Sequence, residues 1–216
     1  MSAIEVKRLS PEIADDFIAF FEGGAFNDNP HWASCYCYFN HFPYSDHWSA
    51  RKAEVNRAAK LELIRTGRAH GVLAYLGGHP IGWCHAAPRA ELAHGGYKDM
   101  PDSTQGGVTV CYVIDPKHRR RGVATLLLHE AVEMLRDMGM TFVEAHPLKA
   151  LPSGDARLSA EARSYHGTLA MYLGAGFEKV REDGDFITVR RTLSPPALRA
   201  ASPRSGEGNG PAARRT

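Results

Sequence analysis

Hydrophobic and polar residues recur along the chain with the periods of strands and helices. Residues 4–9 alternate between apolar and charged side chains, which predicts a short, half-exposed strand. Ser10 and Pro11 are typical of a helix start, and the apolar positions that follow keep helical spacing as far as Gly23. A second helix is predicted over residues 49–66, where apolar side chains recur among arginine, lysine and glutamate.

Two strands and a long loop come next in the pattern. Residues 70–76 and 80–86 are predicted to pair as a hairpin through the turn at 77–80. Residues 87–107 are polar and show little periodicity, and loops longer than about 12 residues are often functional. We therefore expect this loop to lie beside a substrate pocket as a flap.

The stretch from 108 to 138 combines a buried strand, a basic turn and a helix. The apolar run at 108–114 predicts a strand that stops at Pro116, because proline cannot donate a backbone hydrogen bond. A basic turn containing Gly122 precedes apolar side chains at helical spacing over 119–138. A helix N-terminus presents unpaired N–H groups and can hold a phosphate. An ordinary strand-to-helix connection with solvated arginines fits the pattern equally well.

The remaining pattern completes one domain. It predicts a strand over 141–147, a long loop over 148–164, a helix over 165–175 and a closing hairpin of 177–180 with 186–193. After residue 193 the composition changes to proline, alanine, serine, glycine and arginine, which predicts a disordered tail over 194–216. We expect the domain itself to cover residues 1–193.

Composition and charge narrow the class of protein. The 216 residues are 44% hydrophobic and 23% charged, as in a globular domain. A net charge of +2 argues against a dedicated nucleic-acid binder. The sequence has no apolar run of about 18 residues that would span a membrane, and the N-terminus lacks the apolar core of a signal peptide. We therefore expect a cytoplasmic protein whose four cysteines stay as thiols.

Two motifs resemble one enzyme family. The pattern Arg119-x-x-Gly122-x-Ala124 after a buried strand resembles the acetyl-CoA-binding signature of the GNAT N-acetyltransferases, and Tyr172 to Phe177 resembles a second motif near the end of that domain. The resemblance covers roughly residues 4–193. It implies an α/β (α+β) fold with a central mixed, mostly antiparallel, twisted sheet of about 6–7 strands flanked by helices. It also implies a splay between the strands at 108–114 and 141–147, where the thioester would sit.

The resemblance further implies acetyl-CoA as co-substrate, with no metal. Strand backbone groups would hold the pantetheine arm and the amides of the turn would cradle the pyrophosphate. The corresponding residues here are Val113, Ile114, Arg119, Arg120, Arg121, Gly122, Val123, Ala124 and Thr125.

Three residues are candidates for the chemistry. The resemblance assigns Tyr172 the protonation of the departing thiolate, while a purely packing role on an amphipathic helix stays open. Many family members carry an asparagine where this chain has Tyr165, so a contact made by that asparagine is in question. Glu144 and His146 lie two apart on a predicted strand, where the family often places a water-relayed base. His85 is another option, and a solvated or structural role stays open for each.

The aromatic segment at 25–48 contains the candidates for the acceptor site. By the resemblance it would line the acceptor pocket, with Trp32, Tyr36 and Tyr38 in contact with substrate. Its aromatic side chains would serve equally well to cover the sheet. Cys35 and Cys37 also suggest a zinc site, but their spacing is unusual and the chain has no second cysteine pair.

The preferred hypothesis is therefore an acyltransferase (EC 2.3.1) that transfers an acetyl group directly to a primary amine of a small molecule in a ternary complex. A protein or peptide N-acetyltransferase is one alternative, and a non-catalytic acyl-CoA sensor is another. The expected partner is the small-molecule amine, with neither nucleic acid nor membrane. A homodimer stays open because GNAT domains often dimerise.

Overall fold

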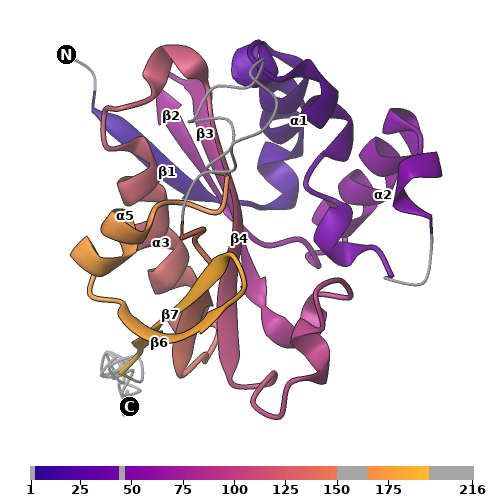
Figure 1. Cartoon of the computed structure of the whole chain (residues 1–216). Coiled ribbons are helices and arrows are strands. Elements are labelled where there is room, and N and C mark those ends of the chain that lie inside the picture. Colours follow the sequence, from indigo (N-terminus) through magenta and orange to yellow (C-terminus); the bar gives the residue numbers. More distant parts are fainter. Residues whose placement is uncertain (1–2, 44–46, 150–164, 195–216) are drawn as a thin grey trace, which may run out of the picture.

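The computed structural model describes residues 3–43, 47–149 and 165–194. One seven-stranded sheet crosses them in the order β1-β2-β3-β4-β5-β7-β6 (Figure 1). Its strands are β1 (Ile4–Arg8), β2 (Val72–Leu76), β3 (His79–Pro88), β4 (Gly106–Ile114), β5 (Phe142–Ala145), β6 (Glu178–Asp183) and β7 (Phe186–Thr192). Neighbouring strands are antiparallel except β4 and β5, which are parallel. The predicted mixed, mostly antiparallel sheet is confirmed.

Helices cover both faces of this sheet. On one face lie α1 (Ala14–Glu22) and α2 (Ala53–Arg65), and on the other lie α3 (Val123–Asp137) and α5 (Leu169–Gly174) (Figure 1). Successive side chains of a strand point to opposite faces. Trp83 of β3 accordingly packs into the core beside α1, while its neighbour Cys84 packs into the core beside α3.

Two helices begin later than the sequence pattern predicts. The helix expected from residue 119 starts at Val123, because Arg120 and Gly122 hold φ of 60° and 78°, outside the helical region. The helix expected from residue 165 starts at Leu169, where the Thr168 side chain accepts a hydrogen bond from the Met171 amide at 3.3 Å. In both cases the non-helical residues lie directly before a helix N-terminus.

The splay between β4 and β5 is confirmed. These strands pair only where Gly106–Thr109 meets Phe142–Ala145. β4 then continues to Ile114 with no β5 partner. At the same point the pairing of β3 with β4 shifts by one residue, so that Val110 forms a bulge. Together, the bulge and the splay leave one edge of β4 open in the middle of the sheet.

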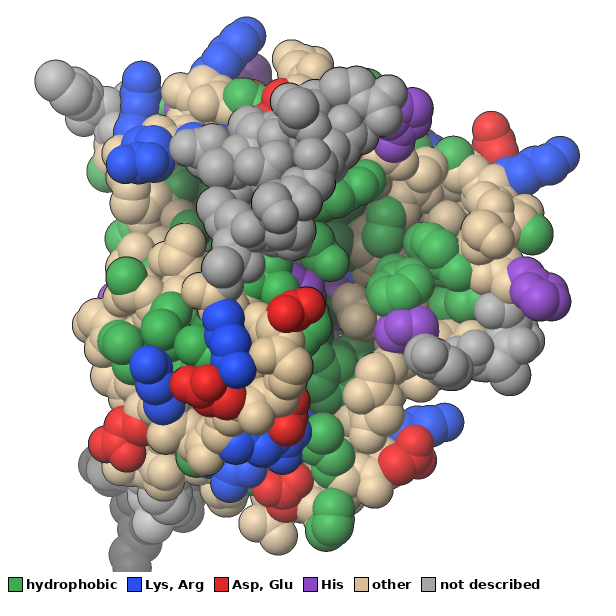
Figure 2. Space-filling view, in the orientation of Figure 1, with side chains coloured by type: hydrophobic (Ala, Val, Ile, Leu, Met, Phe, Trp, Pro, Cys, Tyr) green, Lys and Arg blue, Asp and Glu red, His purple; other side chains and the backbone are tan. Residues whose placement is uncertain are grey.

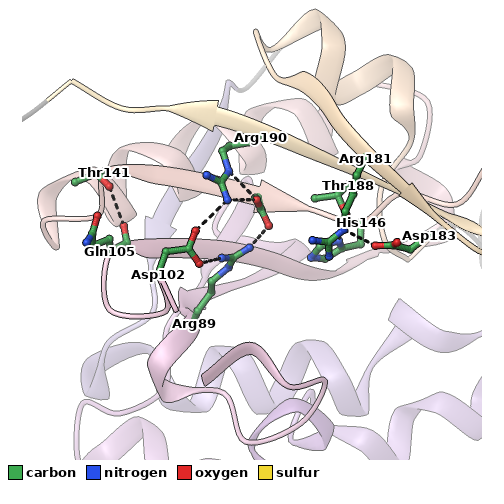
Figure 3. Close-up of polar contacts among 10 residues, drawn as sticks. Arg89, Asp102, Gln105, Thr141, His146, Arg181, Asp183, Thr188 and Arg190 are labelled. Atoms are coloured by element: carbon green, nitrogen blue, oxygen red, sulfur yellow. Dashed lines mark hydrogen bonds and ion pairs between the residues drawn. The ribbon is translucent and has the colours of Figure 1, made fainter. Parts of the chain in front are cut away.

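The loop between β3 and β4 is tied to the sheet through Asp102, and its role as a flap stays a prediction. Figure 3 shows Asp102 of this loop between Arg89 and Arg190, at contact distances of 2.8 and 3.1 Å. Arg89 also pairs with the buried Glu144 of β5, and Arg190 of β7 lies 2.6 Å from the same carboxylate. These contacts join the loop to β5 and β7.

The predicted tail lies outside the described residues apart from Ser194, so the division at residue 193 stays a prediction. None of the helices over 3–43, 47–149 and 165–194 is long and apolar enough to cross a membrane.

Candidate active site

The open edge of β4 borders a cavity of about 630 Å³. The start of α3, residues 165–168 and the aromatic segment around residues 25–40 form its other walls. Figure 2 shows a hollow in the surface of the molecule, with hydrophobic side chains gathered around it. The cavity therefore joins the strand–turn–helix stretch to the aromatic segment, which are far apart in the sequence.

The turn before α3 presents backbone N–H groups to this cavity. Gly122 is the N-cap residue, and no side chain caps the helix. Val123, Ala124 and Thr125 begin α3 and line the cavity. The first N–H groups of a helix have no partner within it, and the helix dipole adds positive charge there. This end of the cavity is suited to bind a phosphate.

The three arginines of the turn have different surroundings. Arg119 donates to the Ile114 carbonyl at 3.0 Å and forms an ion pair with Asp28, in which Nη2 lies 3.1 Å from Oδ1. Arg119 and Arg120 line the cavity, whereas Arg121 borders a separate depression beside Ile4. The Arg119 side chain thus fastens the end of β4 to the aromatic segment.

Val113 and Ile114, the predicted pantetheine contacts, line the cavity along the open edge of β4. Their neighbour Tyr112 donates its backbone N–H to the Tyr165 carbonyl oxygen at 2.7 Å. The Tyr165 ring meets Trp32 edge-to-face, with ring centroids 5.1 Å apart. Residues 165–168 therefore lie against the β4 edge at Tyr112 and form the adjoining wall.

Tyr172 lies buried beneath the point of the splay. Its hydroxyl donates to the His166 carbonyl oxygen at 2.8 Å and lies 3.0 Å from Thr109 Oγ1. Thr109 is the last residue of β4 that pairs with β5. Burial raises the pKa of Tyr172, which keeps the phenol protonated. Thr168 and Met171 line the cavity nearby, whereas Tyr172 itself does not.

Neither of the two candidate bases lies in the cavity wall. Glu144 has both oxygens engaged by Arg89 and Arg190, a pairing that stabilises the sheet. His146 follows the end of β5, and its Nδ1 lies 3.2 Å from Thr188 Oγ1 (Figure 3). Burial, the leading cause, lowers the pKa of His146 to about 4. Neither side chain is part of the cavity wall, although His146 directly follows Ala145, where the splay begins.

Of the three predicted acceptor contacts, Trp32 alone lines the cavity. Tyr36 is buried against Phe21, with stacked rings 5.8 Å apart. The ring of Tyr38 faces the Arg51 guanidinium at 5.1 Å. Tyr36 therefore packs against α1 and Tyr38 packs beside Arg51, so neither side chain borders the cavity.

Several residues that were not among the predicted acceptor contacts also line the cavity. Phe39 and Trp48 add aromatic surface, and His166 adds an imidazole whose pKa burial lowers to about 4. Asn29 is 3% exposed, lines the cavity and has no hydrogen-bond partner for Nδ2 within the described residues. An unpaired buried amide is costly, so this donor is suited to a ligand. No local pattern distinguishes Asn29 from the other asparagines.

Comparison with known proteins identifies the family. A sequence model of the acetyltransferase (GNAT) family matches residues 29–151, which is more than half of the chain. The chain belongs to the GNAT acetyltransferase family. This protein is accordingly an acyltransferase of a family that uses acetyl-CoA as donor. A search of curated proteins found no significant match.

Solved structures with the same fold are distant in sequence. An N-acetyltransferase from Staphylococcus aureus Mu50 aligns with 89% of this chain and 100% of its own, at 12% identity and a TM-score of 0.54. The GNAT domain of S. lividans PAT aligns with 88% of this chain and 90% of its own, at 14% identity and a TM-score of 0.53. A PaiA N-acetyltransferase from Thermoplasma acidophilum, in complex with coenzyme A, aligns with 88% of this chain and 99% of its own. Its sequence identity is 12% and its TM-score is 0.50. At these identities the likeness shows the fold alone.

Proposed function

We propose that this GNAT protein transfers the acetyl group of acetyl-CoA to a primary amine of a small molecule, by direct attack in a ternary complex. The observation that carries the proposal is the continuity of the cavity. The same space is lined by the N-terminus of α3 at one end and by aromatic side chains of the N-terminal segment at the other. A donor and an acceptor bound there would meet beside the open edge of β4.

In this proposal acetyl-CoA lies along β4. The amides of residues 122–125 bind its pyrophosphate, and the backbone of Val113 and Ile114 holds the pantetheine arm. The thioester then reaches the splay beside Thr109. Tyr172, with its hydroxyl on Thr109 Oγ1, supplies a proton to the departing CoA thiolate. Because the pKa of Tyr172 is raised by burial, the phenol holds this proton until a strong base forms nearby.

The acceptor end of the cavity suits a small amine. Trp32, Phe39 and Trp48 offer aromatic faces, which attract organic cations. The Asn29 amide adds a hydrogen-bond donor without another described partner. A volume of about 630 Å³ falls within the range of roughly 300–1,000 Å³ that small-molecule sites occupy. A peptide acceptor would instead require an open groove.

The first test is thermal unfolding with acetyl-CoA, CoA or ATP. A ligand that binds only the folded protein adds about 2.7 kcal/mol of stability at 100 times its dissociation constant. We expect both CoA ligands to raise the melting temperature and ATP to leave it unchanged. If neither CoA ligand has an effect, the assignment of the turn is wrong.

The second test is an acceptor screen read by release of free thiol from acetyl-CoA. Small primary amines should support turnover, and lysine-containing peptides should not. Trp32→Ala should raise KM for the amine at least tenfold, whereas the matched variant Tyr38→Ala, outside the cavity, should leave KM unchanged. Turnover with peptides alone would favour a protein or peptide acetyltransferase instead.

A further inference from the structure

Three of the four cysteines meet at the wall of the cavity. Cys35, Cys37 and Cys111 all line it. Cys111 lies on β4, two residues beyond Thr109, and packs against the hydrophobic cluster that contains Cys37, where the two thiols interact. The Trp83 indole N–H donates to the same sulfur at 3.2 Å. The Trp83 donor and the neighbouring Cys111 thiol both favour the thiolate form of Cys37.

A buried lysine stands beside these thiols. Lys60 is fully buried, and its Nζ lies 3.5 Å from the Cys37 carbonyl oxygen and 5.6 Å from the ring centres of Phe17 and Trp83. Among the described residues, no carboxylate forms an ion pair with Lys60. A buried ammonium needs a compensating negative charge or it gives up its proton. A thiolate at Cys37 supplies that charge from within the cluster.

The pKa shifts of Cys37 and Lys60 and the backbone conformation at Cys37 agree with a thiolate–ammonium pair. The hydrogen bond from Cys111 is the main cause that holds the pKa of Cys37 below its ordinary value, and Lys60 and Trp83 act in the same direction. Burial lowers the pKa of Lys60 to about 8, and the nearby thiols oppose that shift. Tyr36 and Cys37 have φ of 45° and 46°, in the left-handed region that non-glycine residues rarely adopt. Such strain persists where the surrounding structure holds a residue in place.

We propose that Cys37 and Cys111 form an oxidisable dithiol site in the cavity wall, which a hydroperoxide converts into a disulfide. The Cys37 thiolate attacks the peroxide oxygen, the O–O bond breaks, and the leaving oxygen takes up a proton, so that Cys37 becomes a sulfenic acid. The Cys111 sulfur then attacks the Cys37 sulfur. The S–O bond breaks, the Cys111 proton leaves with the hydroxyl as water, and the S–S bond forms. The two thiols are oxidised and the peroxide is reduced.

The other two cysteines are less suited to this chemistry. Burial, helped by the neighbouring Cys37, raises the pKa of Cys35 to about 12. Cys84 is fully buried in the core beside α3, and burial raises the pKa of its thiol too. Only the pair of Cys37 and Cys111 combines an anion-stabilising site with a neighbouring thiol that interacts with it. A disulfide between them would tie the aromatic segment to β4.

The test treats the reduced, full-length protein with hydrogen peroxide at pH 7 and traps the remaining thiols with an alkylating agent. Intact mass should show loss of two thiols, and peptide mapping should show one disulfide that includes Cys111. An ordinary thiol with a pKa of about 8.5 is roughly 3% ionised at pH 7, so Cys37 should react up to about 30-fold faster.

Variants assign the disulfide to its residues. Cys35→Ser and the matched control Cys84→Ser should keep the disulfide, whereas Cys37→Ser and Cys111→Ser should abolish it. Lys60→Met should slow the reaction with peroxide. If that variant does not fold, the pH dependence of Cys37 alkylation in the unmodified protein gives the same information, because a stabilised thiolate stays reactive below pH 8. A disulfide that persists in Cys37→Ser, or four thiols alkylated at equal rates after peroxide, would overturn the proposal.

Discussion

Replacement of Gly122 by alanine tests whether the turn before α3 holds the cofactor. Gly122 has φ of 78°, and an added Cβ would meet no atom within 4 Å. The substitution therefore introduces backbone strain without a steric clash. A left-handed conformation costs an L-residue roughly 1–2 kcal/mol. Relief of this strain would rotate the amides of residues 122–125 away from their present directions.

Gly184 provides a matched control. It lies in the turn between β6 and β7 with φ of 53°, and an added Cβ there also meets no atom within 4 Å. Gly122→Ala and Gly184→Ala should thus lower the free energy of unfolding by a similar amount, about 1–2 kcal/mol. Thermal or denaturant unfolding measures this quantity for both variants.

The two variants should differ in their affinity for acetyl-CoA. A hydrogen bond to a charged group contributes about 1.5–3 kcal/mol, so loss of one amide–phosphate contact should weaken binding roughly 10- to 150-fold. Isothermal titration calorimetry should show this loss for Gly122→Ala and wild-type affinity for Gly184→Ala. Equal affinities in the two variants would refute the assignment of the pyrophosphate to this turn.

Three further changes test the site and the fold. Tyr172→Phe should lower kcat at least tenfold without changing acetyl-CoA affinity, which steady-state kinetics and calorimetry can separate; an unchanged kcat per folded molecule would leave only a packing role. Glu144→Gln should destabilise the protein by about 3 kcal/mol in denaturant unfolding, because two arginines lose their shared carboxylate, and a wild-type midpoint would contradict this. The folded-state pKa of His146, about 4, lies below the unfolded value of about 6.5, so the unfolded chain binds the extra proton and stability should fall as pH decreases from 6.5 to 4. His146→Asn should reduce that slope, and the same change at the exposed His79 should not.

The strand, turn and helix at residues 106–137 were largely predictable because their signals are local. Pro116 ends the strand because proline lacks the N–H that a strand ladder needs. Gly122 can adopt the left-handed backbone that a tight turn before a helix needs. Residues that lie close together in the sequence therefore specify the strand, the turn and the helix. The family match over residues 29–151 agrees with that interpretation.

The surroundings of the charged residues were less predictable because they depend on contacts between distant segments. Asp28 pairs with Arg119, 91 residues away, and Arg89 pairs with Glu144, 55 residues away. The second pair turns a candidate base into a structural ion pair. No periodicity in either segment indicates which partner its charged residue will meet.

The sequence alone determined the order of strands and helices and the basic turn, because these depend on short-range backbone preferences. It also determined the family resemblance, which rests on two short motifs. The tertiary structure decided which aromatic side chains border the cavity and which pack behind it. It also brought Cys37 and Lys60 to Cys111 on β4. These outcomes follow from the packing of α1, α2 and the aromatic segment against one face of the sheet. That packing depends on the shape and burial of whole surfaces, which a linear pattern of residues does not specify.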